Sequence, residues 1–243
     1  MFSRLIAPRW CVLVFTLSAL TTVPMCSHAT GFSVSPIIFE FGVRDRTEVL
    51  SVESSVDERK AFEVTVVRWT QVDGKDVLEP TEDFIVTPPA FNLLAREKRM
   101  LRIVRTEAPP EADEARYRLL LKEIPLFENR VQGRPGLSIT ASVPIFVLPI
   151  QPVQPRFNVT VSKNTDGEGY TIKVVNVGNT HGKFVSAQPV TNNTPVGEPL
   201  ALGGYVLPGS EKSWQVMTDA VKGADAVLVQ LPYGVKLSLG LNK

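Results

Sequence analysis

Residues 61–78, AFEVTVVRWTQVDGKDVL, decide the fold of this chain of 243 residues. In the first half of the segment Phe62, Val64 and Val66 occupy every second position, which is the pattern of a β-strand with two different faces. The pair Asp73-Gly74 that follows is a strong signal for a tight hairpin turn. The segment is therefore predicted to be two antiparallel strands joined by that turn.

Similar patterns continue on both sides of this hairpin. From Gly31 onward, short runs rich in Val, Ile, Phe and Thr are separated by Gly, Pro, Asn or Asp at intervals of roughly ten residues. No long stretch has the periodicity of a helix. Because closely spaced strands of this kind are typical of β-sandwiches, we predict an all-β fold.

A proline-rich stretch divides the chain. Residues 148–155, LPIQPVQP, contain three prolines, which remove backbone donors and favour an extended, stiff connection. The prediction is a first domain over residues 30–149 and a smaller second sandwich over residues 150–243. The strands expected in the second domain are Phe157–Val161, Tyr170–Val177, Phe184–Ala187, Ser213–Met217 and Ala226–Gln230.

The first 29 residues have the features of a secretion signal. Arg4 and Arg9 precede the apolar run 10–20, and small residues lead up to Ala29, after which we expect cleavage. A membrane anchor is the alternative, but the apolar run is shorter than the roughly 20 residues that a bilayer requires. A lipid-modified Cys26 is a second alternative, although the residue before it is not small. We expect a soluble mature chain without a membrane anchor.

Charge and cysteine content limit the possible partners. Because residues 1–29 contain two of the 26 basic residues and no acid, the mature chain has 24 bases against 25 acids and no strong field to attract nucleic acid. The basic run 96–105 lacks interleaved aromatic residues, which favours a strand with one solvated face over a nucleic-acid patch. Cys11 and Cys26 both lie in the segment to be removed, so we expect no disulfide.

Candidate catalytic chemistry is sparse. The mature chain has one histidine, His181, in the turn-like stretch 176–182 (NVGNTHG), where a surface or capping role is expected. The chain lacks the usual zinc ligands, a calcium-type loop, a phosphate-binding glycine loop and a G-x-S-x-G motif. We therefore expect no enzyme, no metal and no cofactor.

Residues 136–149, GLSITASVPIFVLP, form an unusually long apolar strand pattern. Pro144 lies inside it, and proline in a strand is confined mainly to edges or bulges, so we expect this strand at a sheet edge that could accept an incoming strand. The alternative is that the apolar face packs only its own core. The side chains of that face are Leu137, Ile139, Ala141, Val143, Ile145 and Val147.

Arg118 is a charge in what should be a central strand, directly before the apolar residues 119–121. An unpaired buried charge costs roughly several kcal/mol, so Arg118 should meet a carboxylate. That carboxylate could come from Glu114 or Glu123 of the same chain, or from a partner, since arginine can hold a carboxylate with two parallel hydrogen bonds.

Four segments of the first domain, and the motif Asn176–Asn179 of the second, are informative when they are compared with known families. They are 84–91 (FIVTPPAF), 100–105 (MLRIVR), 114–125 (EARYRLLLKEIP) and 143–149 (VPIFVLP). In order and spacing these segments resemble the periplasmic pilus-assembly (fimbrial) chaperones, over most of residues 31–149. The resemblance implies two immunoglobulin-like domains in a boomerang arrangement, without ATP or catalysis.

The resemblance also implies a function. Members of this family act in the periplasm, bind pilin subunits one to one and deliver them to an outer-membrane usher. Their clients are sandwiches that lack a strand, and the chaperone lends its own edge strand, which is β-augmentation. Whether the free form self-associates is left open. The implied donor side chains here are Leu137, Ile139, Ala141, Val143 and Ile145.

The residues at the client-anchoring positions differ from those of the best-known branch of the family. In that branch an arginine of the first strand and a lysine of the donor strand hold the client's terminal carboxylate, but the matching positions here are Ile38 and Pro144. The departure suggests the archaic or alternative branch. Arg118 becomes the first candidate for the anchor and Arg102 the second.

Two other classes of function remain as alternatives. A structural or adhesive surface subunit could also be built of such sandwiches, but residues 31–36 run directly into the first strand without a donor extension. A secreted hydrolase would require His181 to act in catalysis.

Overall fold

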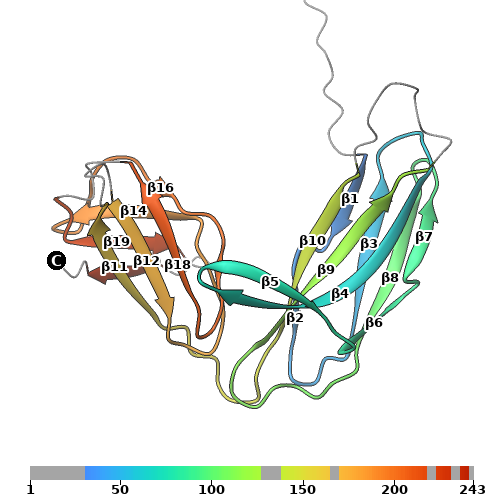
Figure 1. Cartoon of the computed structure of the whole chain (residues 1–243), viewed down its shortest axis with the longest axis horizontal. Helices are drawn as coiled ribbons and strands as arrows, with labels where there is room; N and C mark the ends of the chain where they lie inside the picture. The colour runs from blue at the N-terminus through green and yellow to red at the C-terminus, as the bar shows by residue number, and fades with distance from the viewer. Residues whose placement is uncertain (1–30, 127–137, 165–169, 218–222, 231–235, 241–243) are drawn as a thin grey trace, which may run out of the picture. The chain divides into compact units, whose positions relative to one another are not determined.

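The structure is a computed structural model that describes residues 31–126, 138–164, 170–217, 223–230 and 236–240. The expected secretion signal, residues 1–29, lies outside these ranges. The described residues form strands and no helix, in agreement with the all-β prediction (Figure 1). Accordingly, none of them belongs to a helix long and apolar enough to cross a membrane.

The first sandwich consists of two sheets whose strands pair mostly in antiparallel fashion. One sheet has the order β1 (Phe32–Ser35), β3 (Thr47–Ser54), β8 (Lys98–Arg105) and β6 (Phe84–Thr87). The other has the order β2 (Phe39–Phe41), β10 (Thr140–Val147), β9 (Ala115–Ile124), β4 (Lys60–Val72) and β5 (Lys75–Pro80), and β7 (Ala90–Leu93) also pairs with β4.

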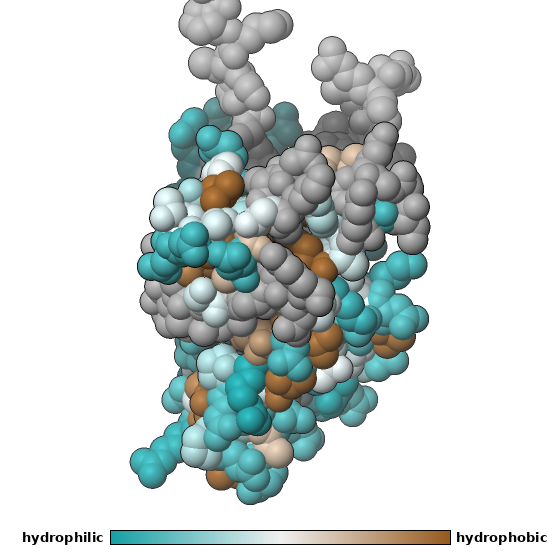
Figure 2. Space-filling view, turned by 90° about the vertical axis from the view of Figure 1, so that its left-hand side faces the viewer, coloured by the Kyte–Doolittle hydropathy of each residue, from teal (hydrophilic) through white to brown (hydrophobic). Residues whose placement is uncertain are grey.

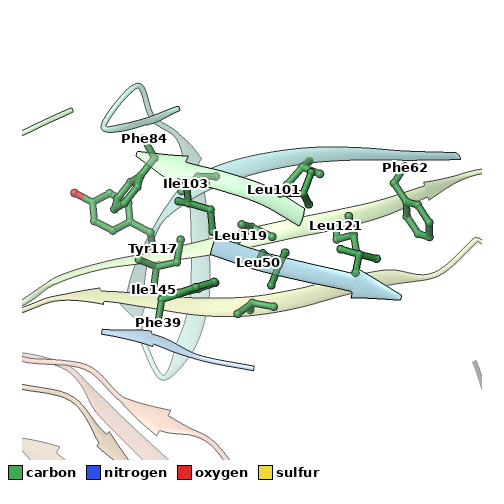
Figure 3. Close-up of a cluster of buried hydrophobic side chains, with 14 of the residues drawn as sticks. Phe39, Leu50, Phe62, Phe84, Leu101, Ile103, Tyr117, Leu119, Leu121 and Ile145 are labelled. Atoms are coloured by element: carbon green, nitrogen blue, oxygen red, sulfur yellow. The ribbon is translucent and has the colours of Figure 1, made fainter. Parts of the chain in front are cut away.

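The predicted hairpin is confirmed as β4 and β5. Its turn residues Asp73 and Gly74 have φ angles of 51° and 74°, the positive values that this type of turn requires. Phe62, Val64 and Val66 point into the core between the two sheets. Figure 3 shows this core, with Ile103 of one sheet facing Tyr117 and neighbouring residues of the other.

The start of the first sandwich determines how much of β10 is covered. β1 pairs with β3 in one sheet, and the chain then crosses to the other sheet, where β2 runs parallel to β10. β2 is short and pairs only with Ile145–Val147 of β10. On its other side β10 pairs with β9 along the whole of Thr140–Val147. Among the residues that the structure describes, much of β10 is therefore paired on one side only.

The second sandwich has its own core, which includes Ile172, Phe184 and Val227. On the face seen in Figure 2, hydrophobic residues are interspersed with hydrophilic ones. Residues 148–156, between β10 and the second sandwich, form no strand, and the predicted boundary after residue 149 stays a prediction. One of its sheets has the order β11 (Phe157–Lys163), β12 (Tyr170–Asn176) and β18 (Glu211–Val216). A two-stranded sheet consists of β13 (Gly182–Lys183) and β17 (Tyr205–Val206). The third has the order β15 (Thr194–Pro195), β14 (Ser186–Thr191), β19 (Ala226–Gln230) and β20 (Lys236–Gly240), and β16 (Leu200–Ala201) also pairs with β14.

Candidate binding edge and its neighbouring arginine

The free part of β10 is a candidate binding edge. Within the described ranges, Thr140–Pro144 have β9 on one side and no strand on the other, because β2 reaches only from Ile145 onward. Backbone N–H and C=O groups along such an edge can pair with a strand of another chain. Pro144 marks the end of this edge and supplies no N–H of its own. The prediction of an edge strand is thus confirmed for the first half of β10.

The predicted donor side chains fall into two groups. Val143 and Ile145 are 2% and 0% exposed and belong to the core of the first sandwich, as the own-core alternative expected. Ile139 and Ala141 are only partly buried and pack against the margin of that core. Leu137 lies outside the described residues. The half of the edge that can present apolar side chains to a partner therefore begins at Ala141 and runs toward the N-terminal end of β10.

Arg118 lies in a central strand as predicted, because β9 is flanked by β10 and β4. The intramolecular partner suggested from sequence was wrong: Glu123 pairs with Lys60, and Glu114 pairs with His181. The acid beside Arg118 is instead Asp76 of β5, with 3.6 Å between Nη2 and Oδ2.

The surroundings of Arg118 are aromatic. Its guanidinium lies 3.6 Å from the centre of the Trp69 ring and 5.8 Å from that of Tyr205, and burial lowers the pKa of the guanidinium while Asp76 opposes that shift. Arg118 is also the register partner of Pro144. Ile38 packs against the cluster of Trp69, Phe146 and Leu207. Of the two positions at which the resemblance implies anchoring residues, Pro144 thus pairs with Arg118, and Ile38 packs against the cluster that contains Trp69.

Arg102, the second anchor candidate, does not join this group. It lies on β8, in the other sheet of the first sandwich, between Val49 and Thr87 in register, and its side chain is exposed. The predicted solvated face of the basic run is confirmed at Arg102. Arg105 of the same strand is an exception, since it is 3% exposed and donates to the carbonyl of Val43.

Of the two roles expected for His181, surface or capping, the surface role was wrong. The residue is 9% exposed, its ring stacks on Phe146 at a centroid distance of 3.5 Å, and its Nδ1 donates to Glu114 at 2.8 Å. Local sequence patterns could not predict these contacts of His181, because Phe146 and Glu114 lie 35 and 67 positions away in the chain. One signal was present: Phe146 is a large apolar residue on the face of β10 opposite to the alternating core residues.

Comparisons with known proteins agree with this arrangement. Residues 31–152 match the family described as pili and flagellar-assembly chaperone, PapD N-terminal domain. The chaperone protein CssC of Escherichia coli is 25% identical over 232 residues, which cover 89% of this chain and 83% of that relative.

Solved structures share the fold at low sequence identity. A chain of the CsuC–CsuE chaperone–tip adhesion subunit pre-assembly complex from archaic Csu pili of Acinetobacter baumannii is 19% identical, with a TM-score of 0.68 over 88% of this chain and 100% of that one. A chain of the SafA pilin–SafB chaperone complex of Salmonella enterica is also 19% identical, with a TM-score of 0.57 over 86% of this chain and 94% of that one. The likeness extends over both sandwiches.

Proposed function

Since the chain belongs to the family of pili and flagellar-assembly chaperones, with residues 31–152 as its PapD N-terminal domain, we propose that it binds pilus subunits by lending them the free edge of β10. The observation that carries this proposal is the one-sided pairing of Thr140–Pro144. A subunit that lacks a strand could complete its sheet there with main-chain hydrogen bonds. The partly buried Ile139 and Ala141, together with Leu137, would enter the subunit's core.

Val143 and Ile145 have a different part in this proposal. Both side chains already fill the core of the first sandwich, so they would fix the position of β10 rather than enter a client. Burial of a Leu or Ile side chain contributes about 1.5–3 kcal/mol, so the side chains nearer the start of the strand suffice to stabilise a client when several bind in register.

The test is co-purification from a periplasm. The mature chain is expressed with candidate subunits encoded at the same locus, as wild type and as Ile139→Asp. We expect a one-to-one complex for the wild type and none for the variant, since a carboxylate at this position would be buried in the subunit. Met100→Asp is the matched control, because Met100 is 66% exposed on the other sheet and the same charge there should leave the complex intact.

The opposite results have equally clear meanings. A complex indifferent to Ile139→Asp would overturn strand donation. Absence of a complex with any subunit would favour the alternative of a structural or adhesive surface subunit, which neither the family nor the relatives favour.

Arg118 is the proposed anchor for the terminal carboxylate of the subunit. The support is that Arg118 pairs in register with Pro144, the last residue of the free edge. Its guanidinium could hold a carboxylate with two hydrogen bonds. Arg118→Ala should weaken the complex about tenfold or more. Arg102→Ala removes the same charge from the other sheet and should have no effect. If Arg102→Ala were the damaging change, the anchor would have to be reassigned.

The remaining parts of the proposal follow from family membership. The protein would work in the periplasm, without catalysis or cofactor, and hand its clients to an outer-membrane usher. The fold shared with the archaic Csu chaperone complex and the changed anchor positions support the archaic or alternative branch. A secreted hydrolase would need His181 exposed to substrate, whereas its ring is covered by Phe146.

A further inference from the structure

The acid beside Arg118 is held in place by a second residue. Asp76 and Gln71 face each other across the β4–β5 hairpin, and Gln71 Nε2 donates to Asp76 Oδ1 at 2.9 Å. Gln71 is itself fixed by the second sandwich, since Nε2 also donates to the carbonyl of Tyr205 at 3.0 Å and Oε1 accepts from the backbone N–H of Leu207 at 3.0 Å. In the unloaded protein this hydrogen bond holds the carboxylate of Asp76 beside Arg118.

The contact between Asp76 and Arg118 is nevertheless incomplete. The Nη2–Oδ2 separation of 3.6 Å is longer than the roughly 2.7–2.9 Å of a charge-assisted hydrogen bond. Among the described residues, the guanidinium of Arg118 has this ion pair and its two aromatic contacts but no hydrogen bond of normal geometry. Asp76 thus offsets the charge of Arg118 while leaving its N–H donors available.

The aromatic contact fixes how those donors can be used. Because the guanidinium lies against Trp69 at 3.6 Å, one of its faces is covered, and its N–H groups point outward in its own plane. The side chain of Arg118 is 17% exposed and that of Asp76 is 44% exposed. An incoming carboxylate can therefore approach the guanidinium from the side on which Asp76 now lies, and Asp76 can move into solvent.

We propose that Asp76 is an internal substitute for the client's terminal carboxylate, which occupies Arg118 in the unloaded protein and is displaced when a subunit binds. This inference rests on the proposed role of Arg118 as the anchor. It assigns to Asp76 a competing role: the residue offsets the charge of a largely buried arginine before loading, and it lowers the affinity for a client carboxylate, which has to displace it.

The experiment uses a peptide probe. Two peptides carry the last eight residues of the candidate subunit encoded at the same locus, one with a free terminal carboxylate and one as the terminal amide. Each is titrated into the full mature chain and followed by calorimetry. The variants are Asp76→Asn, which keeps an oxygen for the hydrogen bond from Gln71, and Glu79→Gln, which removes an equal charge from the opposite face of the same strand.

The free-acid peptide should bind Asp76→Asn roughly two- to fivefold more tightly than wild type, since removal of a partly exposed pair is a modest gain. Glu79→Gln should match the wild type, and the amide peptide should gain nothing from either change. Equal or weaker binding of the free acid by Asp76→Asn would overturn the competing role.

A third variant separates this proposal from the one on which it rests. Arg118→Ala should bind the free-acid and amide peptides equally. If it still prefers the free acid, Arg118 is not the anchor, and the competing role of Asp76 fails with it. If Arg118→Ala loses the preference but Asp76→Asn gains no affinity, the anchor stands and only the role of Asp76 is wrong.

Discussion

The buried carboxylate of Glu114 accepts hydrogen bonds from three donors, and its side chain is 0% exposed. Thr180 Oγ1 donates at 2.9 Å, His181 Nδ1 at 2.8 Å and the backbone N–H of His181 at 3.3 Å. Glu114→Ala would leave these donors buried and unpaired, so the free energy of unfolding should fall by about 3 kcal/mol. Urea unfolding of the chain from Gly31 onward measures the change, and the exposed Glu111→Ala should cost almost nothing.

Tyr117 predicts a dependence of stability on alkaline pH. Burial and a 2.6 Å hydrogen bond to Asp83 raise the pKa of its hydroxyl above the ordinary value of 10.0. The folded protein therefore keeps this proton at pH values at which the unfolded chain loses it. The stabilisation is fully present below pH 10 and is lost as the pH rises further.

The measurement is urea unfolding between about pH 8 and pH 11 for wild type and Tyr117→Phe. The wild type should lose about 1.4 kcal/mol more over this interval than the variant, which has no hydroxyl to titrate. The comparison cancels the titration of the other tyrosines and of the lysines. A difference between the two proteins that stays constant with pH would contradict the role assigned to Tyr117.

At the scale of single elements, β10 shows what alternation can and cannot predict. The pattern of residues 136–149 correctly indicated a strand with one apolar face and a free edge. It could not show how much of that edge stays free, because this depends on where β2 begins, opposite Ile145. β2 lies about a hundred positions earlier in the chain, and its register with Ile145–Val147 leaves no trace in the local pattern of β10.

Two substitutions, one on β10 and one at the residue directly before it, should separate these roles. Val143 is 2% exposed in the core, so Val143→Ala should lower the free energy of unfolding by about 2 kcal/mol. Ile139→Ala removes a larger side chain but from the margin of the core, and should cost less than about 1 kcal/mol. For binding of a subunit the order should reverse, with Ile139→Ala the more damaging. If both variants lost the same free energy of unfolding, Ile139 at the margin would be packed as tightly as Val143 in the core.

At the scale of the whole molecule, the two sandwiches were predictable but the contacts between residues distant in sequence were not. The strand pattern and the prolines of residues 148–155 indicated both units. In contrast, the side chain of Gln71 forms hydrogen bonds with backbone groups of Tyr205 and Leu207, more than 130 positions later in the chain. Because every residue carries such backbone groups, the sequence does not distinguish these two partners. The ion pair between Asp76 and Arg118 was not predictable either, because it depends on the β4–β5 hairpin placing Asp76 beside Arg118.

Gly178 is the point at which the segment after β10 meets the second sandwich. A Cβ atom at this position would lie 2.2 Å from the carbonyl oxygen of Gln154 and 2.5 Å from the backbone nitrogen of Arg156. The backbone of Gly178 also donates to the carbonyl of Arg156 at 3.0 Å. Since both obstacles are backbone atoms, they cannot move aside as a side chain could, and a side chain larger than hydrogen would push the connecting segment away.

Gly178→Ala should therefore lower the free energy of unfolding by about 1–3 kcal/mol, the usual cost of overpacking. Gly223→Ala is the matched control, because a Cβ there would meet nothing within 4 Å. Urea unfolding followed by circular dichroism compares the two variants with the wild type. Equal stability of both variants would show that the connecting segment yields easily, and that its position against the second sandwich is not fixed by this glycine.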